Sequence, residues 1–315
     1  MSPVSTQLNV LPPPSGHTVC YQLSIMPDNI ATFPAFADWL NSHCERSENP
    51  FIRDSWQAIA PCFEVDRLIP DNYGWKFAWD GTIQSQIDDL TNRSTDNLNR
   101  ILWTDHARNI EAYNTMTFWR GIELLKPAIR SLNVHEIIAP AVMARSALEL
   151  ACTYSVNAQV LIANMSQVVF PSNTVVVSQE LEDFIVKMIW GTRLGEPPTY
   201  LKQTNIITTI QKVSKNPKAK EVLPTYEYLC ELAHPNVIGN TRFWSHVDYV
   251  YADGSERRII SRYADGKTSE EILDKILWSL AWSALVFASG FAQTQAAINA
   301  LLQKLGSGAP GSHSR

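Results

Sequence analysis

Residues 133–165 read NVHEIIAPAVMARSALELACTYSVNAQVLIANM, and this stretch decides the fold class. Asn133 is a suitable helix N-cap, and Glu136 follows three residues later at the spacing of a capping box. At 100° per residue most of the circumference is apolar or small. The polar side chains fall on one stripe, formed by Ser146, Glu149, Thr153, Asn157 and Asn164. The pattern predicts a long helix from Asn133 to about Met165, enclosed on most sides.

Helical spacing extends on both sides of this segment. It begins near Ile83, and Pro127 is expected to limit how far that run continues unbent. Further helices are predicted at 179–190, 205–215, 221–233 and 269–304. The stretches RFWSHVDYVY and ERRIISRY predict a β-hairpin that turns at Asp253-Gly254. Towards the N-terminus we expect a strand at 18–26, a helix at 29–46 and an irregular aromatic loop at 62–82.

The predicted fold is therefore mainly α, a helical bundle with a small β-hairpin insertion and a mixed N-terminal region. The expected organisation has four parts. These are a flexible N-terminal arm at 1–19, the mixed region at 20–82, a bundle at 83–305 with its hairpin at 242–263, and a disordered tail at 306–315.

The composition limits the possible partners and compartments. A net charge of -5 gives no basic bias, so the chain lacks the electrostatic footprint of a duplex DNA binder. Five cysteines at wide spacings, without CxxC, fit reduced thiols in the cytoplasm. Residues 276–303 carry no charge and are long enough to cross a bilayer, but polar residues follow Ala292. We expect a buried core or dimer helix there, with a membrane anchor as the lesser alternative.

Common catalytic and cofactor motifs are absent. The sequence has no GxGxxG, GxxxxGK[ST], HExxH, GxSxG or EF-hand loop, and no histidine and cysteine pair at zinc-ligand spacing. No metal or cofactor is expected. Arg145 and Glu149 stand out instead, because this i, i+4 pair lies on the most enclosed helix in the less favourable order. The pair is either a structural contact between helices or part of a site.

A second candidate lies in YEYLCELAHPN, residues 226–236. Pro235 disfavours helical geometry at His234, so the imidazole is expected at a helix C-terminus, where the dipole favours its protonated form. A histidine in that position can bind an anion or transfer a proton. The structural alternative is that His234 caps the last carbonyls or bonds a carboxylate such as Glu149.

A third pattern is R-x4-6-H, in which arginine holds a phosphate and histidine transfers a proton during RNA cleavage. Arg100 with His106 and Arg130 with His135 match it. A chain of this composition is expected to contain about one such match by chance. The Arg130 match also crosses the helix start predicted at Asn133.

Together, MARSALELACTY, MIWGTRLG, NIITTIQKV and the phrase ending in HPN resemble a group of poorly characterised bacterial HEPN-like helical proteins. The resemblance covers roughly residues 100–305. It implies a helical bundle, frequent homodimerisation and a setting in phage defence or toxin systems. Enzymes of that kind cleave RNA without metal through an R-x4-6-H pair, but residues 227–229 here contain no arginine.

The sequence thus predicts an accessory or effector protein that binds RNA, nucleotide or a protein partner at a polar pocket. Arg145, Glu149 and His234 are the candidate catalytic residues, with Tyr226 and Asn236 as substrate-binding residues. Metal-independent ribonuclease activity is the sharper form, and whether the protein is an enzyme stays open. The alternative is a non-catalytic interaction or scaffolding protein that uses apolar helical surfaces.

Overall fold

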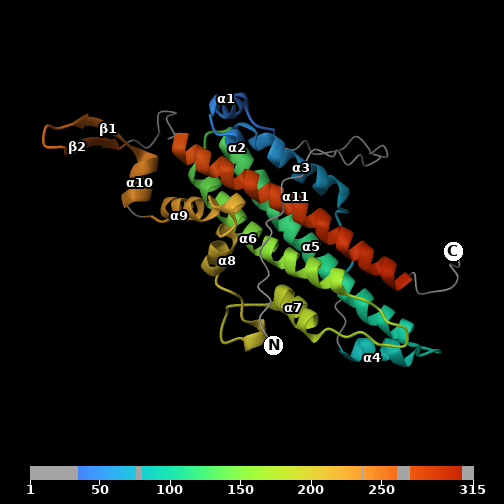
Figure 1. The fold of residues 1–315 in the computed structure, drawn as a ribbon. Helices are drawn as coiled ribbons and strands as arrows, with labels where there is room; N and C mark the ends of the chain where they lie inside the picture. The colour runs from blue at the N-terminus through green and yellow to red at the C-terminus, as the bar shows by residue number, and fades with distance from the viewer. Residues whose placement is uncertain (1–34, 76–79, 236, 261–269, 307–315) are drawn as a thin grey trace. The chain divides into compact units, whose positions relative to one another are not determined.

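The computed structural model describes residues 35–75, 80–235, 237–260 and 270–306. These residues are mainly helical, with one two-stranded antiparallel sheet (Figure 1). The helices are α1 (Asp38–Arg46), α2 (Pro50–Arg53), α3 (Ser55–Leu68), α4 (Asp80–Asp88), α5 (Thr95–Asn133), α6 (Ile138–Gln167), α7 (Gln179–Trp190), α8 (Ile206–Ser214), α9 (Val222–Ala233), α10 (Val237–Trp244) and α11 (Glu270–Gly306). Short 3-10 turns lie at Thr199–Leu201 and Pro217–Ala219. The strands are β1 (Ser245–Val250) and β2 (Glu256–Ile260).

The chain forms two compact units. Unit 1 comprises Met1–Asp66, Arg120–Thr153 and Ile206–Phe287, and unit 2 comprises Arg67–Trp119, Tyr154–Asn205 and Ala288–Arg315. The helices α5, α6 and α11 each contribute residues to both units. The helices and the two-stranded sheet confirm the predicted mainly α class and the predicted small β-hairpin.

Unit 1 has a largely aliphatic core. Its fully buried side chains include Leu125, Ile129, Ala144, Leu148, Ile276 and Leu280 from α5, α6 and α11, and Leu40, Ile59, Ile210 and Leu229 from α1, α3, α8 and α9. The Ser279 hydroxyl donates to the Ala144 carbonyl over 2.8 Å, so α11 and α6 lie close together here. At Gly121 an added Cβ would lie 2.7 Å from the Phe287 ring, so only glycine fits without rearrangement.

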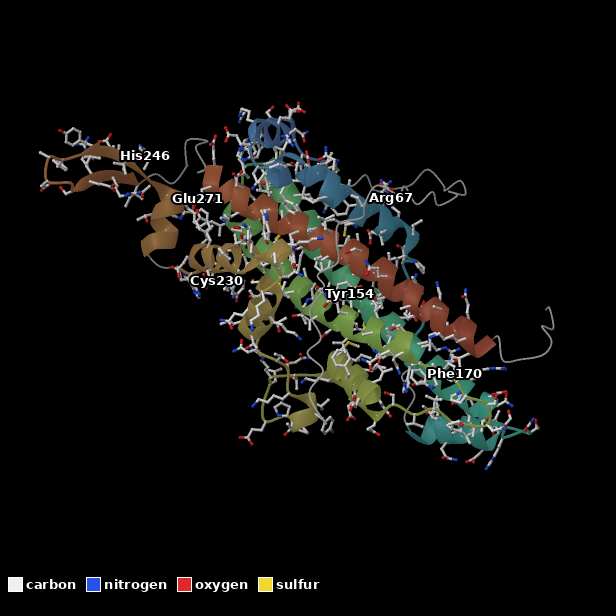
Figure 2. All side chains as sticks on the ribbon, in the orientation of Figure 1. Arg67, Tyr154, Phe170, Cys230, His246 and Glu271 are labelled. Carbon is white, nitrogen blue, oxygen red and sulfur yellow. The ribbon has the colours of Figure 1, made fainter. Side chains whose placement is uncertain are left out.

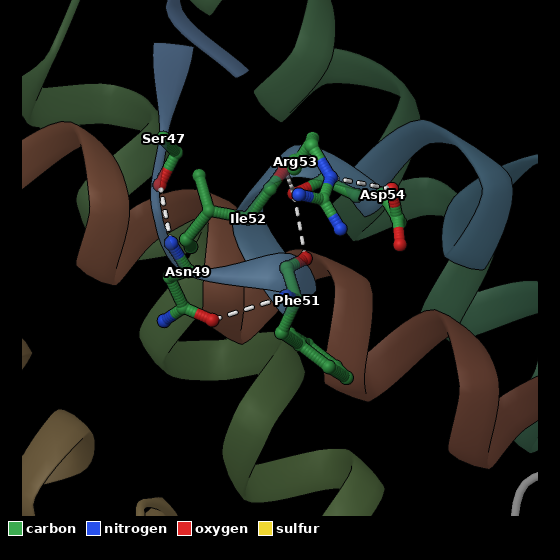
Figure 3. Close-up of polar contacts among 7 residues, drawn as sticks. Ser47, Asn49, Phe51, Ile52, Arg53 and Asp54 are labelled. Carbon is green, nitrogen blue, oxygen red and sulfur yellow. Dashed lines mark hydrogen bonds and ion pairs between the residues drawn. The ribbon is translucent and has the colours of Figure 1, made fainter. Parts of the chain in front are cut away.

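The short helix α2 begins with a side-chain cap. Asn49 Oδ1 accepts a hydrogen bond from the Phe51 amide at 3.0 Å, and Pro50 occupies the first turn (Figure 3). Proline suits this position because its missing N–H would have no partner within the helix. Ile52 is buried, so the cap directs an apolar side chain into unit 1.

Unit 2 has a more aromatic and more polar core. Trp103, Phe118 and Tyr154 are almost fully buried, and the Phe118 and Phe291 rings lie 5.0 Å apart. A Cβ at Gly290 would lie 2.7 Å from Tyr154, so close packing of this ring requires glycine.

Pro127, in the part of α5 that belongs to unit 1, lies inside the helix, which continues to Asn133. Proline removes one helical hydrogen bond there but does not end the helix.

The predicted helix start at Asn133 is wrong. Asn133 is the last residue of α5, and α6 begins at Ile138. The Asn133 side chain instead accepts from the Ala37 amide at 2.8 Å and donates to the Ala35 carbonyl at 2.7 Å. A distant segment of the chain thus uses the groups that would have capped a new helix.

The end of α5 is a Schellman motif. The amide of Glu136 donates to the Ser131 carbonyl and that of His135 to the Leu132 carbonyl. His135 adopts a left-handed φ of 63°, which usually favours glycine. Its ring stacks on Trp39 with the centroids 4.2 Å apart, and this contact stabilises the unusual conformation.

Two predictions for the N-terminal region also differ from the structure. The helix expected at 29–46 spans only Asp38–Arg46 among the described residues. The loop expected at 62–82 is shorter than predicted, because α3 continues to Leu68 and α4 begins at Asp80, while residues 69–75 are irregular as expected. The strand predicted at 18–26, the arm at 1–19 and nearly all of the tail at 306–315 lie outside the described residues.

The predicted hairpin is present but shorter. Residues 242–244 belong to α10, and the strands pair from Ser245 with Ile260 to Val250 with Glu256. Gly254 has a φ of 82°, a left-handed conformation that fits the turn predicted at Asp253-Gly254. A bulge lies between Val247 and Tyr249.

Within the described part of the chain, α11 alone is long and apolar enough to cross a membrane. However, 61% of its most apolar window is buried inside the fold. Burial of this kind is expected of a core helix.

Candidate functional site

The candidate site lies in unit 1, where α6 and α9 approach each other. Arg145 and Glu149 occupy successive turns of α6, and Tyr226 and Cys230 occupy successive turns of α9. Residues four apart share one face of a helix, so each helix presents two side chains together. Figure 2 labels Cys230 on α9. We call these four residues the Arg145 cluster.

The ion pair in this cluster is incompletely hydrogen-bonded. Arg145 Nη2 lies 3.2 Å from Glu149 Oε1, and both side chains remain about one-third exposed (31% and 29%). The contact between Arg145 Nη2 and Glu149 Oε1 is short but does not have hydrogen-bond geometry. Arg145 Nε makes no hydrogen bond either. Glu149 Oε1 and Arg145 Nε are both buried and have no hydrogen-bond partner among the described residues. Leaving such groups unpaired costs free energy, so a further partner would be stabilised here.

Tyr226 holds the guanidinium from the α9 side. Arg145 Cζ lies 5.7 Å from the centre of the Tyr226 ring, within the range of a cation–π contact. Burial lowers the pKa of Arg145, but the hydrogen bond to Tyr226 and the nearby Cys230 and Glu149 raise it, and the net direction is upward. Arg145 is therefore a permanent cation at this site.

The Tyr226 hydroxyl stays protonated at neutral pH. Burial, followed by its hydrogen bond to Cys230, raises the pKa of Tyr226 to about 12. The ring is only 6% exposed. A protonated phenol beside a guanidinium offers hydrogen-bond donors to an anion, and it cannot act as a base near pH 7.

Among the described residues, no side-chain interaction joins the His234 imidazole to the Arg145 cluster, although the His234 backbone contacts Cys230. His234 is the C-cap of α9, with extended backbone and its amide bonded to the Cys230 carbonyl at 3.1 Å. The expected effect of Pro235 on the helix end is therefore seen. The imidazole is exposed, and eight residues of helix separate its position from Tyr226, a rise of about 12 Å. Its catalytic role stays a prediction, and Asn236 lies outside the described residues.

The two R-x4-6-H matches do not form a site of the expected kind. Burial lowers the pKa of His106 to about 4, so this residue is neutral and cannot supply a proton near pH 7. Its ring packs edge-on against Trp103 at 5.4 Å. His135 belongs to the Schellman motif and stacks on Trp39. Both histidines are used in packing.

Cys230 is the member of the cluster that sequence reasoning missed. Its spacing of four from Tyr226 on a predicted helix was the available signal. Across the described residues, no group of three or more histidine, cysteine or acidic side chains is arranged to hold a metal ion. The guanidinium of Arg145 and the phenol of Tyr226 are groups of a kind that can bind an anion.

Comparisons with known proteins add no family assignment. No protein-family model matches the chain, and no curated protein or solved structure matches it.

Proposed function

We propose that the protein binds a phosphate group of RNA or a nucleotide at the Arg145 cluster. The observation that carries this proposal is the buried Arg145 Nε, which has no hydrogen-bond partner among the described residues. Guanidinium groups bind phosphate through paired N–H donors, and Arg145 keeps one such donor unused. The resemblance to HEPN-like proteins supports a role as an accessory or effector protein of a bacterial defence or toxin-like system, acting in the cytoplasm.

The carboxylate of Glu149 distinguishes a phosphate site from a purely structural ion pair. Its carboxylate competes with a phosphate for the same guanidinium, so an incoming anion must displace or share Arg145 Nη2. Removing the negative charge of Glu149 should therefore strengthen phosphate binding. If the pair only joins helices, its removal weakens the fold and gains no affinity.

The test is binding of a labelled single-stranded RNA and of inorganic phosphate to purified variants. Arg145→Gln is expected to weaken RNA binding at least tenfold, about 1.4 kcal/mol. It should also reduce the dependence of log K on log salt by about 0.7, as loss of one phosphate contact does. Glu149→Gln is expected to tighten binding severalfold. Arg130→Ala, an exposed arginine on α5, is the matched control.

Metal-independent RNA cleavage is the stricter form of the proposal. In this step the ribose 2′-hydroxyl attacks the phosphorus and loses its proton to solvent, and the bond from phosphorus to the 5′ oxygen breaks. His234 would donate a proton to that leaving oxygen while Arg145 holds the phosphate. Incubation with tRNA and mRNA in the presence of a chelator tests it, with His234→Ala as the comparison. Intact RNA with the original protein would reject cleavage and leave the binding proposal to the first experiment.

A specific observation favours a second candidate function, a non-catalytic interaction protein. Val134, Ile138 and Val142 are exposed (66%, 41% and 41%) and lie on the turn before α6 and along its first two turns. Apolar side chains gathered in this way are typical of a protein interface. Wild-type protein that binds neither RNA nor phosphate but co-purifies with a stable partner would favour this function.

A further inference from the structure

Four lysines lie close together at the end of α8 and in the turn that follows it. These are Lys212, Lys215, Lys218 and Lys220, and all four are exposed. They are four of the eleven lysines in a chain of 315 residues, although they lie within only nine consecutive positions. We call these four residues the lysine strip.

No acidic side chain of the same segment neutralises the lysine strip. Residues 197–220 contain a fifth lysine, Lys202, but no Asp or Glu, since the nearest acids are Glu196 and Glu221. None of the four lysines forms an ion pair with a described residue. The whole chain carries a net charge of -5, so this segment is opposite in sign to the rest. A basic patch of this kind attracts polyanions.

Local structure holds the lysine strip on the outside of unit 1. On α8 the side chains of Ile210 and Val213 are buried, which leaves Lys212 on the exposed side of the helix. In the 3-10 turn that follows, the Asn216 side chain accepts from the Lys218 amide at 2.9 Å. Ala219 is buried, so the turn is anchored between two exposed lysines.

The surroundings of the lysine strip favour a soluble polyanion over a membrane. Between Thr208 and Lys220 the exposed side chains are polar or charged, with Pro217 as the exception. A helix that lies in a membrane interface instead exposes large apolar side chains beside its cations. Lysine binds phosphate as a point charge and reads no base, which suits the backbone of a nucleic acid strand.

The lysine strip is also near the Arg145 cluster along the chain. Helix α8 packs against α9 within unit 1 (Figure 1). Lys220 precedes Tyr226 of the cluster by six residues, a rise of about 9 Å at helical geometry. Sites for single strands cover roughly 4–16 nucleotides, so one strand is long enough to contact both places. Glu227 is exposed on α9, so the basic surface does not continue along that helix.

We propose that the lysine strip binds the phosphate backbone of a single strand of nucleic acid, so that the ligand is a strand of several nucleotides and not a free nucleotide. This inference rests on the proposed function, because it takes a nucleic acid as the ligand of the Arg145 cluster. The lysine strip adds a second contact region that is independent of base sequence.

Fluorescence anisotropy of the full chain with a labelled RNA of about 12 nucleotides, at several salt concentrations, tests the proposal. Lys212→Gln with Lys215→Gln, and Lys218→Gln with Lys220→Gln, are each expected to weaken binding at least about tenfold. The slope of log K against log salt should fall by about 0.7 for each lysine that contacts a phosphate. Binding of inorganic phosphate should stay unchanged. The matching DNA strand should lose the same factor, because lysines contact phosphates and not the 2′-hydroxyl.

The matched control removes the same amount of charge elsewhere in unit 1. It combines Arg46→Gln with Arg130→Gln, two exposed arginines. Salt screens charges that lie more than about 8 Å from the bound strand at physiological ionic strength, so the control should stay within about twofold of wild type. Thermal unfolding of each variant verifies that the fold is retained.

Wild-type affinity in both lysine variants would overturn the proposal, and so would equal weakening in the arginine control. AMP that binds as tightly as the RNA would show that strand length adds nothing and would reject it too. Binding to phosphatidylserine vesicles without RNA binding would assign the lysine strip to a membrane surface instead. The two sites fail separately. Weakening in the lysine variants with full binding by Arg145→Gln rejects the Arg145 site alone, and the reverse pattern rejects the lysine strip alone.

Discussion

The Tyr154 network of unit 2 and the Arg145 cluster of unit 1 differ in how completely their buried polar side chains are hydrogen-bonded. In unit 2 the Tyr154 hydroxyl donates to Asn114, and Asn114 donates to the Phe291 carbonyl at 3.3 Å. Asn157 likewise donates to the Tyr113 hydroxyl at 2.7 Å. In unit 1 the Arg145 cluster leaves a buried donor and a buried acceptor without hydrogen bonds.

This difference separates polar groups that already hydrogen-bond within the fold from polar groups that could still bond a ligand. The amide and phenol groups of unit 2 use one another and a main-chain carbonyl, so a ligand would have to break existing bonds. At Arg145 Nε and Glu149 Oε1 a ligand would not have to break an existing hydrogen bond. Other buried hydroxyls, such as those of Ser283 and Thr294, also lack hydrogen-bond partners among the described residues, so the Arg145 cluster is distinguished by the charge on its unpaired groups.

The largest expected effect on stability comes from breaking the hydrogen bonds that join Asn114 to Tyr154 and Phe291 in unit 2. Asn114→Ala removes the acceptor of the Tyr154 hydroxyl and the donor to Phe291, so the free energy of unfolding should fall by about 3 kcal/mol. Urea denaturation measures it. Asn92→Ala, at an exposed position, should change stability by less than about 0.5 kcal/mol. A loss below about 1 kcal/mol for Asn114→Ala would remove the contrast between the units.

An intermediate effect concerns His106 and pH. Burial lowers the pKa of His106 from its ordinary value of 6.5 to about 4 in the folded protein. As pH falls from 6.5 towards 4, the unfolded chain takes up the proton first, and stability is therefore lost across this window. Between pH 7 and 4.5, His106→Gln should lose about 2 kcal/mol less stability than wild type.

Guanidinium denaturation at the two pH values measures this difference. His246→Gln, at an exposed histidine on β1, is the control and should follow wild type. Equal pH dependence in wild type and His106→Gln would show that unit 2 tolerates a charged imidazole, contrary to the packing against Trp103.

The smallest expected effect concerns the ion pair in unit 1. A double-mutant cycle with Arg145→Gln and Glu149→Gln should give a coupling free energy below about 1 kcal/mol. The pair is partly exposed and has the less favourable helical order. A coupling above about 2 kcal/mol would instead identify the pair as a structural interaction that stabilises α6.

Local sequence signals predicted the elements that local contacts stabilise. Helix α7 was predicted at its observed limits, and local contacts explain them: the Ser178 side chain accepts from the Leu181 amide at its start, and Gly191 follows its end. The hairpin turn followed from Asp253-Gly254. The helix start predicted at Asn133 was wrong because its side chain hydrogen-bonds to residues 35 and 37, almost one hundred positions away. No local rule contains that contact.

The candidate site was predicted only in part. The order and enclosure of Arg145 and Glu149 pointed to α6, and the contact with Tyr226 places α9 against it. Cys230 was missed because it belongs to no metal or redox motif. The unpaired Arg145 Nε depends on atomic positions that spacing along a helix does not determine.

The three helices shared by both units also bear on how the chain folds. Since α5, α6 and α11 each supply residues to unit 1 and unit 2, no single cleavage in a linker separates the units as intact fragments. Many native contacts join positions far apart in the sequence, which slows folding. We expect the two units to melt in one cooperative transition, with a protease-resistant product that retains all three helices.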